Sequence, residues 1–454
     1  MSLRSGTPFA RLESTIESAA SGGSLPNTDS YNSPRGGLLI EDLTDAELVR
    51  AHRVDSVLPA LAARAVEADR SGEFPIEHVR TISEAGLLGL TVPIEYGGLG
   101  GGLRDLAAAT FAMATECAST SLAYFFQCSG SSRGLLPLAA IDAGLFPDDE
   151  IPIVRAFGEK VLHRMGDEGR WIANFASESV RTKGAAVTIA TEASRADGGW
   201  VINGVKSFGC ATGIADDYLV TAKLDTGDTA ADLAVFLIPR STPGVAERTK
   251  WDAVGMRATA THGIILENVF VPDEDSLTVP GAFVNMTLVS RGSFVGNQVA
   301  LSSVYVGAAQ AIYDFAMNYL TSTKYANSDD PIGSSDLHRQ LIGKMRSHLD
   351  TAFLWARRQI ELETADPEIL AKGDVIANWR IAKGEIADNC FQVAVHALKA
   401  CGTSNTGMGG SISRGFRDLS MALVQGFPAE RGRLEAASYL VSGSEGAQFG
   451  TLKS

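Results

Sequence analysis

Long apolar runs and paired cysteines are both missing from this chain of 454 residues. No apolar stretch reaches the roughly 18 residues of a membrane-spanning helix, and the first residues lack the basic-then-apolar pattern of a signal peptide. The cysteines show neither a C-x-x-C pair nor the His/Cys spacing of a zinc site. We therefore expect no membrane span, no metal site, reduced thiols and a cytoplasmic location. The five cysteines are Cys117, Cys128, Cys210, Cys390 and Cys401.

Positive charge is also scarce. Thirty-nine Lys and Arg stand against 53 Asp and Glu, which gives a formal net charge of −14. Such a chain repels polyphosphates and anionic membrane surfaces, so we expect no nucleic-acid binding. The content of 45% hydrophobic and 20% charged residues is that of an ordinary globular protein with large cores. Residues 1–40 hold many Ser and Gly and few large apolar side chains, which predicts a flexible arm.

Helical spacing of apolar residues begins after Thr44, and we assign residues 41–170 to an N-terminal helical domain. Within it, one apolar helix is predicted from Leu106 to Phe126. The Gly-rich phrase from Ala85 to Gly101 is interpreted as a loop, because no strand precedes it and no Lys-Ser/Thr follows, as a phosphate-binding loop requires.

The pattern changes to alternation of apolar and polar residues in the region 171–281. We predict a middle domain built as a small antiparallel barrel. Its predicted strands are TIATEA from Thr188, WVINGVK from Trp200, YLVTAK from Tyr218 and LAVFLIP from Leu233.

Residues 282–454 are predicted to form a C-terminal helical bundle. One apolar stripe with steps of three and four runs from Leu337 to Ile360, and a second long helix ends at Gly402. A last helix is expected after Asp418. Four long helices with short connections are typical of an up-down bundle.

Two phrases point to the relatives of this layout: NGVKSFGCATGIADDYLV, Asn203 to Val220, and GMRATATHGIILENVFVP from Gly255. With the order helices, strands, helices, they resemble the acyl-CoA dehydrogenase superfamily over residues 42–441. The resemblance implies a mostly α fold with a central β-barrel: an N-terminal helical domain, a middle antiparallel β domain and a C-terminal four-helix bundle. It also implies FAD as the cofactor.

In the family, an aromatic residue and a nearby hydroxyl residue pack on the flavin ring. Laid on this sequence, those places fall to Phe208 and Cys210, while the family's Thr-Glu-Pro strand end falls to Ala176, Ser177 and Glu178. Phe208 as a core residue and Ser177 as a turn residue are the alternatives, and the two phrases favour the cofactor role. Cys210 is either a buried filler or a thiol able to form a flavin adduct.

The family's contacts to the FAD diphosphate are altered. The usual Arg aligns near Thr323, with Lys324 beside it, and the Gln-x-x-Gly-Gly loop becomes the stretch from Lys399 to Gly402 and Thr403. Lysines neutralise a diphosphate as point charges, without the planar fit of Arg. Backbone N–H groups of residues 403–410 form either a phosphate nest or a plain loop.

The family's catalytic base is missing from both of its usual places. Counting from Arg417-Asp418 leads to Gly426, with Gln425 as the neighbouring side chain, and the other place holds Ser290. A Gln does not take a proton at neutral pH. Glu430, one helical turn further on, is the remaining candidate base; a solvated Glu at a helix start is the alternative.

The resemblance implies three possible functions. The first is an FAD-dependent dehydrogenase that desaturates an acyl or aminoacyl thioester on CoA or a carrier protein and passes electrons to an electron-transfer flavoprotein. The second is a monooxygenase that receives reduced flavin from a flavin reductase and forms a C4a-peroxide. Relatives of this kind often carry a His near the position of Gln425, where this chain has none; His396 and His262 are the other candidates, with a core role as the alternative for His396. The third is a member without turnover. A homodimer or homotetramer is expected in each case.

Overall fold

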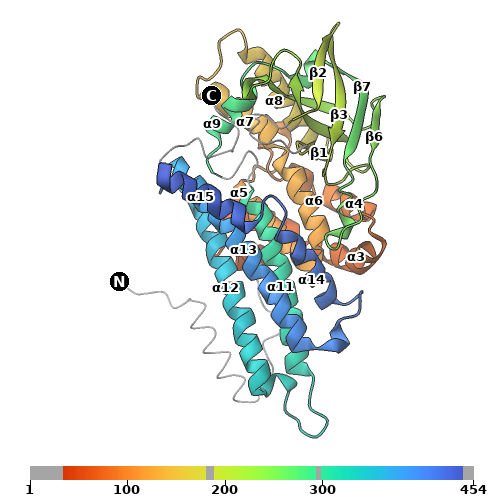
Figure 1. The fold of residues 1–454 in the computed structure, drawn as a ribbon, viewed down its shortest axis with the longest axis vertical. Coiled ribbons are helices and arrows are strands. Elements are labelled where there is room, and N and C mark those ends of the chain that lie inside the picture. Colours follow the sequence, from red (N-terminus) through yellow and green to blue (C-terminus); the bar gives the residue numbers. More distant parts are fainter. Residues whose placement is uncertain (1–33, 180–188, 293–297, 443–454) are drawn as a thin grey trace. The chain divides into compact units, whose positions relative to one another are not determined.

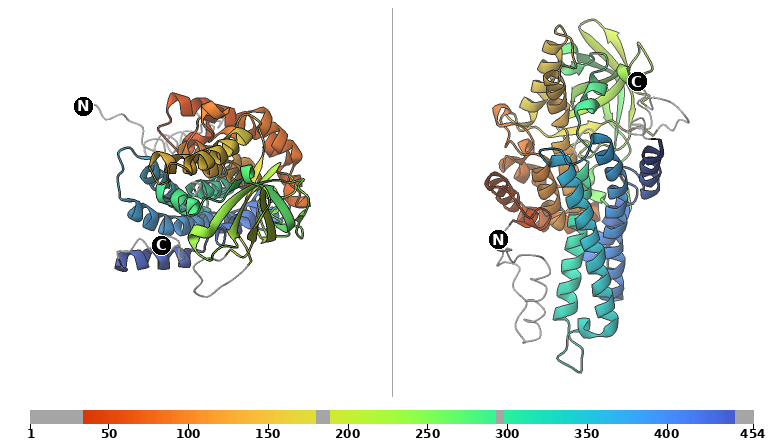
Figure 2. Two further views of the ribbon diagram at one scale, coloured as in Figure 1. Left: turned by 90° about the horizontal axis from the view of Figure 1, so that it is seen from above. Right: turned by 90° about the vertical axis from the view of Figure 1, so that its left-hand side faces the viewer.

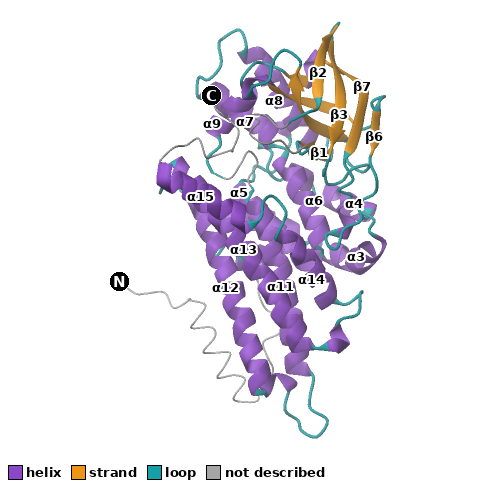
Figure 3. Ribbon diagram, in the orientation of Figure 1, coloured by secondary structure: helices purple, strands orange, loops and turns teal. Residues whose placement is uncertain are grey.

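The computed structural model describes residues 34–179, 189–292 and 298–442. They belong to one compact unit that starts at Arg35. Most of the arm predicted at residues 1–40 lies outside the described residues, as does Thr188, the start of one predicted strand. The order of helices, strands and helices predicted from the sequence is confirmed (Figure 3).

The N-terminal part is helical, as predicted, and its first helix begins where Thr44 caps it with a reciprocal Thr44–Glu47 capping box. The helix predicted from Leu106 to Phe126 is two helices, because Cys117 adopts an extended backbone (φ −144°, ψ 95°) that ends one and starts the next. The helices are α2 (Asp45–Asp55), α3 (Leu58–Ser71), α4 (Ile76–Glu84), α5 (Leu103–Glu116), α6 (Ala118–Ser129), α7 (Ser132–Asp142) and α8 (Ile151–Met165).

The middle part is a curled sheet of eight strands in the order β6-β7-β3-β2-β4-β5-β8, with β1 also paired to β4. The sheet is mixed, whereas an antiparallel barrel was predicted: β1 and β2 both run parallel to β4. Arg170 and Trp171 bind the Asp217 and Asp216 side chains, so β1 starts beside the start of β4 and runs the same way. The strands are β1 (Ile172–Phe175), β2 (Glu192–Ala196), β3 (Gly199–Lys206), β4 (Asp217–Leu224), β5 (Leu233–Pro239), β6 (Val245–Glu247), β7 (Ile264–Pro272) and β8 (Ser276–Leu277).

The C-terminal part is a helical bundle, as predicted, with α12 and α13 covering the two predicted apolar stretches. The last helix was predicted to follow Asp418, but Asp418 already lies inside α14. Gly426 (φ 70°) and Pro428 then separate α14 from α15. The helices are α9 (Ala282–Val289), α11 (Val299–Ser322), α12 (Asp336–Thr364), α13 (Lys372–Cys401), α14 (Ser411–Ala422) and α15 (Ala429–Ser442).

The sheet lies at one end of the bundle, and α11 to α14 run away from it (Figures 1 and 2). Helix α5 packs along α11, and α7 packs on α8 and α9 beside the sheet. Among the described residues, no helix combines the length and the apolar character needed to cross a membrane.

Candidate functional site

The loop after β3 presents Phe208 at the end of the sheet that faces the bundle. Its ring is 58% exposed, and its backbone is in the left-handed region (φ 57°), which costs a bulky residue roughly 1–2 kcal/mol. The Trp251 ring meets Phe208 edge-on, with 5.9 Å between ring centroids. A strained, exposed aromatic beside a tryptophan is a ready-made surface for a flat ligand.

The end of β1 packs against this loop. The Ser207 N–H donates to the Ser177 carbonyl oxygen (2.9 Å). A Cβ at Gly209 would overlap the Phe175 ring, so the loop approaches the strand as closely as glycine allows. Ala176, Ser177, Phe208 and Cys210, four of the residues predicted to hold the cofactor, therefore lie together.

A buried ion pair fixes the same strand end. Lys206 Nζ lies 2.6 Å from Glu178 Oε1, and both side chains are almost fully buried. Burial alone would raise the pKa of Glu178, but the charge and hydrogen bond of Lys206 outweigh it and lower that pKa. Glu178 also accepts from the backbone N–H groups of Ala190 and Thr191. The pair thus anchors the loop that carries Phe208.

Cys210 begins a short chain of hydrogen bonds behind the aromatic surface. Its Sγ lies 3.1 Å from the Thr261 hydroxyl, which lies 2.7 Å from the Thr259 hydroxyl. Burial raises the pKa of Cys210 to about 12, so the thiol stays protonated. This environment favours the predicted filler role of Cys210 over adduct formation.

Gln425 lies where the family base was sought. Its Oε1 accepts a hydrogen bond of 3.0 Å from the hydroxyl of Tyr305, a fully buried residue in the second turn of α11. A Cβ at Gly426 would lie 3.9 Å from Leu301 Cδ2 and from Lys383 Cε. Neither Gln425 nor Gly426 has a group that takes a proton at neutral pH.

Glu430, the candidate base, is exposed in the first turn of α15, beyond the turn at Pro428. The other nearby carboxylate, Glu435, is engaged in ion pairs with Arg380 and Arg431. The other family position, Ser290, is buried at the end of α9. The role of Glu430 as a base stays a prediction, and its exposed setting does not favour it.

The Arg417-Asp418 pair joins all three parts of the fold. Arg417 binds Asp69 of α3 through two hydrogen bonds of 2.6 and 2.8 Å. Asp418 accepts from the Met256 N–H (2.6 Å) in the segment between β6 and β7, and burial raises its pKa to about 6. This junction holds the segment with Trp251 against the bundle.

The residues predicted to bind the diphosphate lie elsewhere in the chain's fold. Lys324 follows the end of α11, 19 residues beyond Tyr305, which is about 28 Å of helix rise. It pairs with Asp329 across an exposed turn. Lys399 is exposed in the last turn of α13, just before Gly402 and Thr403. One chain therefore does not bring these residues to Phe208.

Both candidate histidines favour the neutral imidazole, because burial lowers the pKa of each. His262 Nδ1 accepts from the Trp251 N–H (2.8 Å), and burial lowers its pKa. His396 is buried and stacks on His348, with 5.5 Å between ring centroids, and burial again lowers its pKa. His262 lies behind the aromatic surface and orients Trp251 there.

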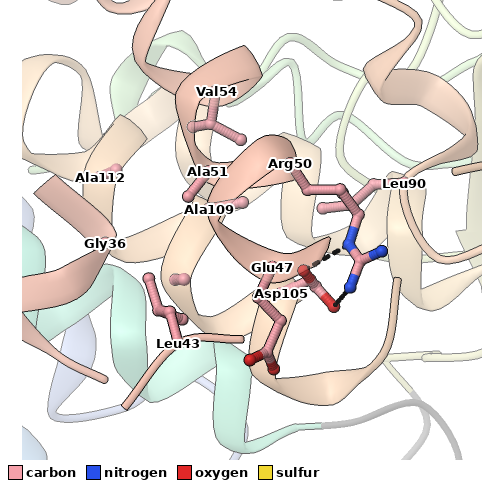
Figure 4. Close-up of a pocket in the computed structure, with 11 residues that line it drawn as sticks. Gly36, Leu43, Glu47, Arg50, Ala51, Val54, Leu90, Asp105, Ala109 and Ala112 are labelled. Atoms are coloured by element: carbon pink, nitrogen blue, oxygen red, sulfur yellow. Dashed lines mark hydrogen bonds and ion pairs between the residues drawn. The ribbon is translucent and has the colours of Figure 1, made fainter. Parts of the chain in front are cut away.

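A small hollow of about 10 Å³ under α2 holds one water at most, and Arg50 faces Asp105 at its wall (Figure 4). It has no part in the candidate site. An open hollow of about 370 Å³ lies along β4, β5 and β6, where Tyr218 and Glu247 approach the turn at Gly213 that follows Cys210. This second hollow adjoins the segment that continues from the Phe208 loop.

Sequence reasoning missed Trp251, Tyr305 and Lys383. Trp251 stands in a turn-rich phrase just before Gly255. An aromatic residue in such a segment was a signal from which Trp251 could have been predicted. Tyr305 and Lys383 lie in helices without a local motif, so only the packing of α11, α13 and α14 reveals them.

Comparison with known families gives three matches in chain order. Residues 45–137 match the family described as acyl-CoA dehydrogenase, N-terminal domain. Residues 176–269 match the middle domain of acyl-CoA dehydrogenase, and residues 299–424 match the C-terminal domain. The matches cover the helices, the sheet and the bundle described above.

Individual relatives include two different kinds of enzyme. L-evernosamine nitrososynthase of Micromonospora sp. is 32% identical over 61% of this chain, and the alignment spans 62% of that protein, less than two thirds of its length. Cyclohex-1-ene-1-carbonyl-CoA dehydrogenase of Syntrophus aciditrophicus is 26% identical over 83% of this chain and 84% of its own. The solved structure of KijD3 with FMN and a dTDP-linked amino sugar has a TM-score of 0.75 at 24% identity, covers 91% of this chain and 97% of its own, and shows the same fold.

Proposed function

Because this chain belongs to the acyl-CoA dehydrogenase family, we propose that it binds a flavin against Phe208 and acts as a flavin-dependent monooxygenase on an amine nitrogen. The observation that carries the proposal is the hydrogen bond from Tyr305 to Gln425. It supports the proposal because the neutral amide of Gln425, beside Gly426, stands at the position predicted for the carboxylate base of a desaturating enzyme of this family. Oxygenation of an amine needs no such base, since the nitrogen lone pair is itself the nucleophile.

Three features of the chain support flavin binding. Phe208 and Trp251 offer an exposed aromatic corner, and the backbone of Phe208 is held in the left-handed region. Ser177 places a hydroxyl group at the adjoining strand end. The protonated Cys210 and its threonine partners give the corner a neutral backing. When bound, a reduced flavin supplies the two electrons with which one oxygen atom of O2 goes to the substrate and the other to water.

The likeness to a nitrososynthase supports the choice of an amine substrate. That relative acts on L-evernosamine, and its identity to this chain is higher than that of the CoA dehydrogenase. A flavin reductase is the partner that fits this reaction, because the monooxygenase must receive its flavin already reduced.

A second copy of the chain completes the proposed flavin site. Lys324 lies 19 residues beyond Tyr305, about 28 Å of helix rise, so it reaches a flavin diphosphate only if it comes from another subunit. Lys399 and Thr403 are assigned to the same second subunit. Light scattering at several concentrations tests the expected homodimer or homotetramer. A monomer that binds flavin with full affinity contradicts this arrangement.

The activity is tested with full-length protein loaded with FAD or FMN. Reduced flavin from a reductase, 18O2 and a panel of amino sugars and their nucleotide conjugates are supplied, and products are followed by mass spectrometry. Incorporation of one 18O into an amine product supports the proposal. Flavin binding without oxygenation of any amine argues against it, and no flavin binding under any condition points to a member without turnover. Phe208→Ala is the matched variant and is expected to lose both flavin and product.

Desaturation of an acyl thioester is the second candidate. It is favoured by the likeness to a CoA dehydrogenase over most of this chain. The natural electron acceptor would then be an electron-transfer flavoprotein. Anaerobic addition of acyl-CoA and acyl-carrier thioesters to the FAD-loaded protein tests it: bleaching of the flavin supports this candidate and excludes the first as the main activity. If bleaching persists in Glu430→Gln, Glu430 is not the base.

A further inference from the structure

Arg133, in the first turn of α7, is a buried cation. The side chain is 2% exposed, and among the described residues neither Nε nor Nη1 has a hydrogen-bond partner. Its guanidinium lies over the Phe283 ring of α9, 5.1 Å from the centroid. No carboxylate in the described part of the chain forms an ion pair with it. The contact with Phe283 stabilises the cation only weakly.

Three other cations in the described part of the chain that are buried or nearly so have polar partners. Arg417 binds Asp69, Lys206 binds Glu178, and Lys383 donates to two backbone carbonyls. Burial lowers the pKa of Arg133, but only to about 10, so it remains charged at neutral pH. A buried charge without partners is strongly destabilising, and it persists in a fold where something that binds there offsets the cost.

Further unsatisfied polar atoms lie on the neighbouring sheet face. Gly130, three residues before Arg133, lies over Leu219, since a Cβ there would be 3.8 Å from Leu219 Cδ1. Asn174 pairs with Leu219 across β1 and β4, and Thr221 is two residues along β4, so all three side chains share one face. Asn174 Oδ1 and Thr221 Oγ1 are buried and have no hydrogen-bond partner. The side chains of Asn174 and Thr221 thus have unused hydrogen-bonding groups on the sheet face that the start of α7 covers.

This face is separate from the proposed flavin surface. Leu219 and Phe283 belong to the smaller apolar cluster of the protein, whereas Phe175, Tyr218 and Cys210 belong to the larger one on the opposite face of β4. An anion bound by Arg133 would therefore lie on the other side of β4 from the proposed flavin surface, where α7 packs on α9.

We propose that Arg133 is the recognition residue of a second binding site, which takes a small oxyanion: a carboxylate or a phosphate group. The planar guanidinium presents donors that match two oxygens of either group, which a lysine ammonium does not. The inference does not depend on flavin binding, so the two proposals fail separately.

Thermal unfolding of the full-length protein tests the site, with inorganic phosphate or glutarate compared with chloride at matched ionic strength. Binding to the folded state raises the melting temperature with concentration, and calorimetry gives the affinity. A response to phosphate alone identifies a phosphate site, and a response to glutarate alone identifies a carboxylate site. No response of the natural protein to either anion overturns the proposal.

Two variants separate recognition from a structural role. Arg133→Met keeps most of the volume and removes the unpaired charge, so in chloride it is expected to melt no lower than the natural protein, while its anion affinity falls at least tenfold. Arg133→Lys is expected to lose most of the affinity as well. Arg417→Met, which strips a paired buried cation from Asp69, is the matched control and is expected to melt lower. If Arg133→Met melts as low as this control and keeps the anion response, Arg133 is structural and the proposal is wrong.

Discussion

The hydroxyl of Tyr305 in α11 donates to the side-chain oxygen of Gln425, 3.0 Å away, and so ties the first helix of the bundle to the turn that follows α14. Tyr305 is fully buried, and burial raises the pKa of its phenol, which stays a donor at every ordinary pH. The hydrogen bond fixes the neutral amide of Gln425 in the turn where the sequence predicts the position of the family's base.

Removal of this hydrogen bond is expected to weaken the turn. Tyr305→Phe should lower the free energy of unfolding by about 1 kcal/mol, the usual net value of a buried hydrogen bond. A double-mutant cycle with Gln425→Ala, followed by denaturant unfolding, isolates the interaction. A coupling energy near zero would show that the two side chains do not interact in solution.

Phe208 is expected to serve binding at a cost in stability. Phe208→Ala and Phe208→Gly both remove the ring and should weaken flavin binding about tenfold or more, since a stacked aromatic is worth roughly 1.4 kcal/mol. Only glycine accepts φ 57° without strain, so Phe208→Gly should be more stable than Phe208→Ala by about 1 kcal/mol. Fluorescence titration with flavin and denaturant unfolding measure the two effects.

A different result would change the role of this residue. If either variant loses several kcal/mol of stability while flavin affinity stays the same, Phe208 is a core residue and the aromatic surface is misassigned.

The sequence was sufficient for the order of helices and strands because period and length are local signals. LAVFLIP is a short continuous apolar run and forms β5 at its predicted bounds. Gly402 ends α13 with a positive φ of 68°, which favours glycine. The break at Cys117 was not predictable, because no Gly or Pro marks it. The parallel start of β1 depends on Asp216 and Asp217, whose partners lie 45 and more residues away.

The candidate site, too, was predicted where its signals are local in the sequence and missed where they are not. Ala176, Ser177, Phe208 and Cys210 come together because two short segments pair through Ser177 and Ser207, as the resemblance implied. The contacts of Tyr305, Lys383 and Asp418 form between segments far apart in sequence. Arg133 attracts notice only because two of its buried nitrogen atoms have no hydrogen-bond partner among the described residues. Features of this kind are recognised only in the folded structure.

The five thiols are expected to be silent in the folded protein. All are free and buried, and burial raises the pKa of Cys210 and Cys128 to about 12 and that of Cys401 to about 11. An aromatic disulfide reagent at pH 8 should react on the order of a hundredfold more slowly with native than with guanidinium-unfolded protein, which should release five thiols. Rapid reaction of one thiol in the native state would identify an accessible thiolate and reopen the adduct role of Cys210.

Asp418 is expected to make stability depend on pH between 4 and 6. Its pKa is about 6 in the folded chain against 3.8 in the unfolded chain, so the folded state holds more protons in this window and loses stability as pH rises through it. Asp418→Asn keeps an oxygen acceptor for the Met256 N–H and has no proton to lose.

The difference in unfolding free energy, natural protein minus Asp418→Asn, should therefore fall by up to about 3 kcal/mol from pH 4 to pH 6 and stay level above it. Urea unfolding at pH 4, 5, 6 and 8 measures the difference. A difference that rises with pH would show a carboxylate stabilised in its charged form by Arg417 and Arg414, contrary to the burial seen here.

Lys383 is expected to show the opposite dependence at high pH. Its ammonium donates to the carbonyls of Ala422 (2.8 Å) and Phe427 (2.6 Å) and lies over the Phe427 ring, while burial lowers its pKa to about 8 from 10.5. Between these values the unfolded chain holds more protons, so folding gains stability as pH rises. Lys383→Met removes the titration and both hydrogen bonds, and should be less stable by about 1–3 kcal/mol at pH 7.

The stability gap between the natural protein and Lys383→Met should then widen by up to about 3 kcal/mol between pH 8 and 10.5. Lys399→Met, an exposed change at the other end of α13, is the matched control and should show no such widening. Guanidinium unfolding at pH 7, 8, 9 and 10 measures both variants. A stability difference that narrows above pH 8 would contradict the lowered pKa. It would mean that the fold stabilises the charged amine of Lys383 beside Gly426.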